Sequence, residues 1–311
     1  SEARAMRGTI HITPGRPRVL RHIIPGRPTV TTHLYLLART QRTVRARHRQ
    51  RSVIGNKVTR GTPRVRRNRR QVHRRRLRHC RRGERLAELK TELERNGLEI
   101  RCHAVDLADA TKMEEFLAAL AADGTSVDFL INNAGLGDHG LFEESEWSRV
   151  QAMLDINIRA LTRLTHALLP GIIRSKRGAV LNVSSITGFL PMPKMAVYAA
   201  TKAYVNSFTE ALRAELRGTG VAVTALCPGP VNTEFGALAK RGDEADAAPA
   251  PDVLKQPVDR IVRDGLNAVD RDRARVVPGW LLAMLMFITS LVPIFILRVF
   301  ITPKRRPRAT T

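Results

Sequence analysis

Tyr198 and Lys202 are a pair of residues that could carry acid–base chemistry. They lie four positions apart in a segment, 197–217, that is predicted to be helical, so both side chains share one face. A lysine ammonium beside a tyrosine hydroxyl favours the phenolate, which lowers the tyrosine pKa from its usual value of about 10. Such a tyrosine can exchange a proton with an alcohol oxygen. The alternative is an ordinary solvated helix face.

Two further polar residues could assist this pair. Ser185 stands thirteen positions before Tyr198, where a predicted strand ends, and its hydroxyl could hydrogen-bond a substrate oxygen and stabilise developing charge. Its alternative role is to start a helix, and the adjacent Ser184 is a second choice for the chemical role. Asn157 falls inside a predicted helix although asparagine is a poor helix former. Its alternative is a solvent-facing polar side chain.

The elements that must position these residues alternate between strand and helix. Such alternation predicts an α/β fold with a doubly wound, mostly parallel, Rossmann-like sheet covered by helices on both faces. Ligands bind such sheets beyond the carboxyl ends of the strands, which is where the polar residues above lie. Pro170 is predicted to end the longest of the earlier helices. The predicted strands are 99–105, 127–131, 179–183 and 221–226, and the predicted helices are 85–96, 113–122, 147–169 and 197–217.

The order of the motifs resembles the short-chain dehydrogenase/reductase family over about residues 83–275. The motifs are Asn132-Asn-Ala-Gly135, Asn157, Ser184-Ser185, Tyr198-Ala-Ala-Thr-Lys202 and Pro228-Gly229-Pro-Val-Asn-Thr233. The resemblance implies an oxidoreductase that transfers a hydride between NADP(H), or NAD(H), and a carbonyl or secondary alcohol, and it implies a homo-oligomer. It assigns Tyr198 as general acid/base, with Lys202, Ser185 and Asn157 as its helpers.

The resemblance also implies which residues bind the cofactor. Tyr198 and Lys202 would hold the nicotinamide ribose, and Asp106 would contact the adenine, although Asp106 could equally cap a helix. Arg81 and Arg82 stand where a 2′-phosphate is often bound. The remaining cofactor residues that the resemblance implies are Asn132, Gly135, Pro228, Gly229 and Thr233.

Positive charge is concentrated in residues 1–82. This segment holds 25 of the 53 Lys and Arg residues but only one of the 28 acids, Glu2, so the other 229 residues are close to neutral. The segment contains no Asp, Phe or Trp and no Gly-rich turn of the kind that lets backbone amides approach a pyrophosphate. We expect that it cannot supply an apolar strand and helix, and that the chain as written binds cofactor weakly or misfolds.

Two explanations for residues 1–82 remain open. One is a genuine basic arm that binds nucleic acid or anionic lipid, although Tyr35 is its only aromatic residue for base stacking, which makes nucleic acid the less favoured partner. The other is a frameshift, so that the segment is translated in the wrong reading frame. This explanation is favoured because translation of GC-rich coding DNA in a shifted frame typically gives arginine-rich sequence without Asp. A catalytically impaired relative and a basic nucleic-acid- or lipid-binding protein are therefore the alternatives to an active enzyme.

The C-terminal region is predicted to border the substrate and a membrane. Residues 235–252 stand where the family places a substrate lid, and their low hydrophobicity suggests mobility. Residues 280–297 form an uncharged run followed by a basic tail, Lys304-Arg305-Arg306-Pro-Arg308. We predict a peripheral helix on a membrane surface and a hydrophobic substrate. The alternative is that the run packs over the substrate pocket or in a dimer interface.

The cysteines and the N-terminus suggest a cytoplasmic protein. Cys80, Cys102 and Cys227 lie far apart without metal-ligand spacing, so no metal site is predicted and a reduced compartment is expected. No signal peptide pattern is seen.

Overall fold

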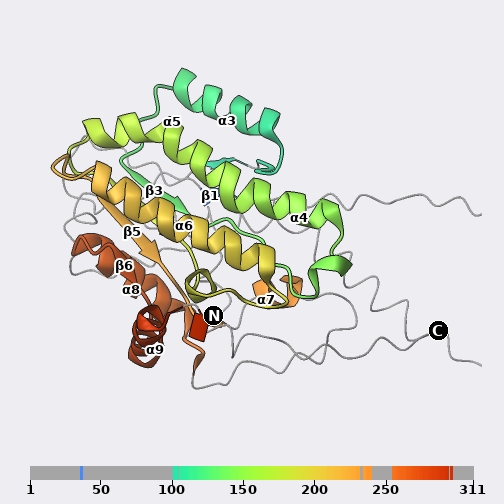
Figure 1. The fold of residues 1–311 in the computed structure, drawn as a ribbon. Helices are drawn as coiled ribbons and strands as arrows, with labels where there is room; N and C mark the ends of the chain where they lie inside the picture. The colour runs from blue at the N-terminus through green and yellow to red at the C-terminus, as the bar shows by residue number, and fades with distance from the viewer. Residues whose placement is uncertain are drawn as a thin grey trace, which may run out of the picture.

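A computed structural model describes residues 36–37, 101–103, 105–231, 234–239, 254–293 and 295–296. Its main sheet has four parallel strands in the order β3-β4-β5-β6 (Figure 1). A separate parallel pair joins β1 to β2. The parallel sheet confirms the predicted α/β, Rossmann-like class. The strands are β1 (Leu36–Leu37), β2 (Cys102–His103), β3 (Phe129–Asn132), β4 (Ala179–Val183), β5 (Ala222–Leu226) and β6 (Arg275–Val276).

Helices cover both faces of the sheet because its central strands are apolar on both sides. On one face, Ala179, Leu181 and Leu226 pack with side chains of α8. On the other face, Val180 and Val223 pack with side chains of α5 and α6. The central strands are thus sandwiched between two apolar layers, as in other doubly wound sheets. The helices are α3 (Ala110–Ala122), α4 (Trp147–Leu154), α5 (Leu161–Arg174), α6 (Ala196–Glu215), α7 (Glu234–Ala239), α8 (Val258–Asp270) and α9 (Trp280–Leu291).

Three short helical segments join these elements. The turns η3 (Phe142–Glu144) and η5 (Ile186–Phe189) are 3-10 helices. The segment η4 (Asp155–Ala160) is a π-helix that connects α4 directly to α5. The predicted helix over 147–169 is therefore one continuous rod with a π-helical turn in its middle.

The prediction that Pro170 ends this rod is wrong. Helix α5 continues through Pro170 to Arg174. Pro170 is exposed, so the carbonyl that loses its N–H partner lies on the solvent side, while Ile172 is fully buried in the core beyond it. The free energy gained by burying the last turn thus exceeds the cost of the backbone hydrogen bond that Pro170 removes.

The part of the chain before residue 105 is described only in pieces. The predicted strand 99–105 is reduced to β2, and the predicted helix 85–96 lies outside the described residues. Contrary to our expectation for the basic segment, Leu36–Leu37 forms a two-residue strand beside β2. These two residues belong to an apolar stretch of that segment, Leu34–Ala38.

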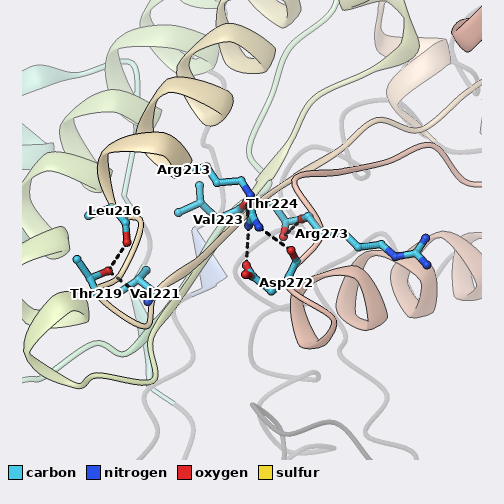
Figure 2. A network of polar contacts seen from close by, with 8 residues as sticks. All are labelled: Arg213, Leu216, Thr219, Val221, Val223, Thr224, Asp272 and Arg273. Atoms are coloured by element: carbon cyan, nitrogen blue, oxygen red, sulfur yellow. Dashed lines mark hydrogen bonds and ion pairs between the residues drawn. The ribbon is translucent and has the colours of Figure 1, made fainter.

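A polar network fixes the end of the sheet far from the carboxyl ends of its strands (Figure 2). Arg213 of α6 binds the Asp272 carboxylate at 2.6 Å and the Asp272 carbonyl oxygen at 2.7 Å. Thr224 of β5 donates to the Arg273 carbonyl oxygen at 2.7 Å. These contacts tie α6 and β5 to the turn between α8 and β6, so they position the scaffold and not the site.

Within the described part of the chain, no helix has both the length and the apolar character needed to cross a membrane. The uncharged run predicted over 280–297 forms α9 up to Leu291.

Candidate active site

Ser185, Tyr198 and Lys202 converge at the carboxyl end of β4. Ser185 follows β4, while Tyr198 and Lys202 lie on the first turns of α6, and all three are buried. The Ser185 hydroxyl accepts a hydrogen bond from the Thr187 backbone N–H at 3.2 Å, and it is close enough to the Tyr198 hydroxyl to affect its pKa. The Lys202 ammonium nitrogen lies 5.8 Å from the centre of the Tyr198 ring. Ser184, the alternative serine, instead donates to the Lys202 carbonyl oxygen at 3.0 Å.

Asn157 joins this group from the π-helix η4. Its Oδ1 accepts from the Leu136 N–H at 2.8 Å, and its Nδ2 donates to the Leu136 carbonyl oxygen at 2.9 Å and to Thr201 Oγ1 at 3.0 Å. The side chain is 1% exposed, so the alternative of a solvent-facing asparagine is wrong. A π-helical turn inside a longer helix is a common feature of functional sites.

The predicted lowering of the Tyr198 pKa is wrong for the structure described here. Burial raises the pKa of Tyr198 to about 12, and the nearby hydroxyls of Ser185 and Thr187 only partly oppose this effect. Burial also lowers the pKa of Lys202 to about 8, so its charge is costly in this environment. Desolvation is therefore the largest influence on both groups, and Tyr198 keeps its proton at neutral pH.

Lys202 is held by the backbone of β4. Its Nζ donates to the Val183 carbonyl oxygen at 2.8 Å. In the described residues no carboxylate forms an ion pair with it. A buried ammonium has three donors, so donors remain for a hydroxyl-rich ligand.

Gly135, which follows β3, and Asn132, the last residue of β3, have different roles. A β-carbon at Gly135 would lie 3.5 Å from Asn157 Oδ1 and 3.6 Å from Lys202 Nζ, so Gly135 lines the group described above. Asn132 instead points into the sheet, where its Nδ2 donates to Asn182 Oδ1 at 2.8 Å and to Thr165 Oγ1 at 3.0 Å. Its side chain supports the sheet beneath the site.

The other predicted cofactor residues are more scattered. Asp106 is not the helix cap: its carboxylate accepts from the Ala108 N–H at 3.1 Å, while Asp109 caps α3. The physical reason is spacing, because α3 begins at Ala110 and Asp109 directly precedes it. Pro228 accepts from the Ile186 N–H at 3.0 Å, which joins the end of β5 to η5. Thr233, Arg81 and Arg82 lie outside the described residues.

Helix α7 covers the site. The Phe235 ring lies 5.7 Å from the Tyr198 ring, centre to centre, and the Ala239 carbonyl oxygen accepts from the His139 N–H at 2.9 Å. Residues 235–239 thus form part of a helix that contacts the site, and the mobility predicted for 235–252 stays a prediction. Residues 240–252 lie outside the described residues.

Two residues at the site were missed from the sequence. Thr201 is fully buried, and its hydroxyl donates to the Tyr198 carbonyl oxygen at 2.8 Å while accepting from Asn157. Phe235 forms the apolar cover over Tyr198. The position of Thr201 between Tyr198 and Lys202 was the one signal available for it. Phe235 begins the predicted lid segment 235–252, but its contact with Tyr198 was not predicted.

Comparison with known proteins gives the same family as the motifs. The model of the short chain dehydrogenase family matches residues 75–243, beginning eight residues before the predicted start. The chain is 41% identical over 172 residues to sulfoacetaldehyde reductase of Chromohalobacter salexigens, covering 53% of this chain and 66% of that protein. It is 39% identical over 172 residues to an NADP-dependent 3-hydroxy acid dehydrogenase of Escherichia coli, covering 54% and 67%. The matched part thus spans about two thirds of the length of these relatives.

A solved structure agrees with this result. A short-chain dehydrogenase from Sphingobium yanoikuyae in complex with NADPH aligns with a TM-score of 0.56 and 28% identity, covering 72% of this chain and 82% of that one. A second, from a study of 7beta-hydroxysteroid dehydrogenase stereoselectivity, aligns with a TM-score of 0.58 and 25% identity, covering 68% and 80%. The chain belongs to the short-chain dehydrogenase family of oxidoreductases.

Proposed function

We propose that this protein transfers a hydride between NADP(H) and a carbonyl or secondary alcohol. The observation that carries the proposal is the convergence of Ser185, Tyr198, Lys202 and Asn157, from three different elements, in one buried site at the carboxyl end of β4. The names of the Escherichia coli relative and of the Sphingobium yanoikuyae complex support NADP(H) as the cofactor.

Tyr198 is the proton donor in this proposal. A tyrosine with a pKa of about 12 keeps its proton at neutral pH and can give it to a carbonyl oxygen as that oxygen gains negative charge. Ser185, buried near Tyr198 at the end of β4, would donate to the same oxygen and stabilise the charge. Hydride from the bound nicotinamide would complete the reduction.

The described residues fit one half of the cofactor. Lys202 offers buried donors to a ribose diol, and Gly135 leaves space beside Lys202 that a side chain would narrow. The other half needs a Gly-rich turn for the pyrophosphate, and residues 1–82 contain no such sequence. We therefore propose that the chain as written binds NADPH weakly, and a tight affinity measured by calorimetry would contradict this.

We also propose that residues 1–82 are translated out of frame. Their charge and their missing turn support this explanation over a genuine basic arm. The gene itself provides the test: a single shift near Arg82, or slightly upstream where the family match begins, should restore a Gly-rich turn. If no shift does so, the segment is a basic arm. The protein is then better interpreted as a catalytically impaired relative or as a lipid- or nucleic-acid-binding protein.

A hydrophobic substrate is the finer part of the proposal. The Phe235 ring beside Tyr198 gives the site an apolar wall. The apolar segment from Trp280 onward supports peripheral contact of a cytoplasmic protein with a membrane surface through residues 280–308. We expect a homo-oligomer, as the resemblance implies.

The test of the proposed function is Tyr198→Phe, which removes only the hydroxyl. Consumption of NADPH with a panel of ketones and aldehydes, at cofactor concentrations high enough to offset weak binding, should fall by about a hundredfold or more. Ser185→Ala should give a smaller loss, and Trp147→Phe on the exposed surface of α4 is the control. Turnover that survives Tyr198→Phe would exclude the assigned chemistry.

A further inference from the structure

We propose that the outward face of α9 docks on an anionic lipid bilayer and that the bilayer delivers the substrate, a lipid-soluble ketone or secondary alcohol. The substrate part rests on the proposed function, whereas the docking part does not. The inference starts from an unusual feature of α9, which is apolar on both its inner and its outer face.

The inner face of α9 is fixed to the protein. Leu282 and Met286 lie one helical turn apart and are 2% and 7% exposed. A β-carbon at Gly229 would lie only 2.5 Å from Leu282 Cδ1, so Leu282 fits directly against the turn after β5. This packing accounts for one side of the helix only.

The outer face of α9 carries large apolar side chains in solvent. Trp280 is 74% exposed, Phe287 is 65% exposed and Leu291 is 67% exposed. These positions follow one another at intervals of seven and four, so they form a stripe along the helix. Further exposed apolar residues in and just beyond the helix are Met284, Leu285, Ile288, Phe295 and Ile296.

Helix α8 shows what an ordinary surface helix in this protein looks like. It has 13 residues against 12 in α9, and its inner positions are equally apolar. Its exposed positions, however, are all charged: Asp259, Arg260 and Arg263. Compared with α8, the outer face of α9 is suited to an apolar environment and not to water. An exposed contiguous apolar patch of this kind usually marks a contact surface.

The positive charge of the sequence around α9 indicates what binds its outer face. From residue 273 to the end, the chain has seven Lys and Arg residues and no acid. Basic residues next to an inserted apolar helix strengthen binding to anionic lipid. A second copy of this chain would bring the same positive charges to the contact, so repulsion disfavours it.

The position of α9 connects this surface to the active site. Leu282 contacts Gly229, Pro228 binds the Ile186 N–H, and Ile186 directly follows Ser185. Only these few residues separate the inner face of α9 from the serine of the site. A bilayer on the outer face would therefore lie one helix away from the place where a carbonyl substrate binds.

The two tryptophans of the chain provide the experiment. Trp280 lies on the outer face of α9, and Trp147 lies on α4 with a similar exposed fraction of 66%. Trp147→Phe leaves Trp280 as the only reporter, and Trp280→Phe leaves Trp147. Each full-length variant is mixed with vesicles of phosphatidylcholine and phosphatidylserine that contain a doxyl-labelled lipid, and with vesicles of phosphatidylcholine alone.

We expect the Trp280 emission to shift to the blue and to be quenched, and the Trp147 emission to change little. Phe287→Gln with Leu291→Gln should weaken vesicle binding, measured by co-sedimentation, by about tenfold or more. Binding should be weaker without phosphatidylserine and at high salt. Equal quenching of both tryptophans, or unchanged sedimentation of the double variant, would overturn the docking.

Other outcomes are equally informative. Absence of vesicle binding, with a dimer that the double variant dissociates, would assign the face to a second copy and overturn the proposal. The proposed function is judged separately, because Tyr198→Phe should bind vesicles like the parent chain. If the parent reduces water-soluble ketones but not those dissolved in the vesicles, the lipid-delivered substrate is wrong although the oxidoreductase stands.

Discussion

The interior beneath the site and the outer face of α9 both depart from the usual rule that apolar side chains are buried and polar ones exposed. The interior holds buried polar groups, and α9 holds exposed apolar ones. One network of this interior is satisfied within the chain: Asn182, fully buried, accepts from Asn132 and donates to Thr209 at 3.0 Å. Such satisfied networks specify a single packing.

The outer face of α9 has no equivalent balance among the described residues. Its large side chains lie in water, while the same helix is anchored by Leu282 and Met286. A buried polar group can find its hydrogen-bond partner within its own chain. An exposed apolar face is stabilised only when another phase or molecule covers it.

The largest expected effect tests the two sides of α9. Leu282→Ala should lower the free energy of unfolding by about 2–5 kcal/mol, because it opens a cavity against Gly229. Phe287→Ala should change it by less than about 0.5 kcal/mol in the absence of lipid. Urea denaturation of both variants measures this. A similar loss for both would mean that the chain itself covers the outer face.

The second prediction uses pH to probe the buried Lys202. Its pKa is lowered to about 8 in the folded protein from 10.5, so unfolding takes up a proton between these two values. The Lys202 contribution to the free energy of unfolding should therefore rise with pH, by about 2 kcal/mol between pH 8 and pH 10. The buried Cys227 thiol, whose pKa burial raises to about 12, acts in the opposite direction over the same range.

Tyr198 does not mask this effect in that window. Its pKa is raised from 10.0 to about 12, so its contribution is complete below pH 10 and is lost as the pH rises through 12. Denaturation curves of the parent chain and of Lys202→Met should therefore differ by a free energy of unfolding that rises across the window, because Cys227 contributes to both proteins alike. An equal rise in both would assign it to another group.

The third and smallest effect concerns Thr201. Thr201→Val keeps the shape but leaves Asn157 Nδ2 without this partner, which should cost roughly 1–2 kcal/mol of stability. Thr201→Ser should restore it, because serine keeps the hydroxyl. If turnover also falls with valine and recovers with serine, Thr201 positions the site through Asn157. A valine variant as stable as the parent would show that the hydrogen bond between Asn157 and Thr201 contributes little to the free energy of unfolding.

The sequence predicted much of the fold where local pattern and tertiary packing agree. The predicted strand 179–183 is β4, and the predicted helix 197–217 differs from α6 by one or two residues at each end. The extension of α5 beyond Pro170 was not predictable, because it depends on Ile172 reaching the core formed by β3 and β4. The same holds for Phe235, which is distant from Tyr198 in sequence and meets it only through α7.

The sequence by itself determined the family and the alternating α/β order, and it predicted Ser185, Tyr198, Lys202 and Asn157 as the residues of the site. It could do so because residue types and spacing along a helix or after a strand are local properties. Only the tertiary structure decided the protonation of the site and the two faces of α9. Burial depends on elements far apart in the chain, and burial, more than the neighbouring charge, raises the pKa of Tyr198 and lowers that of Lys202.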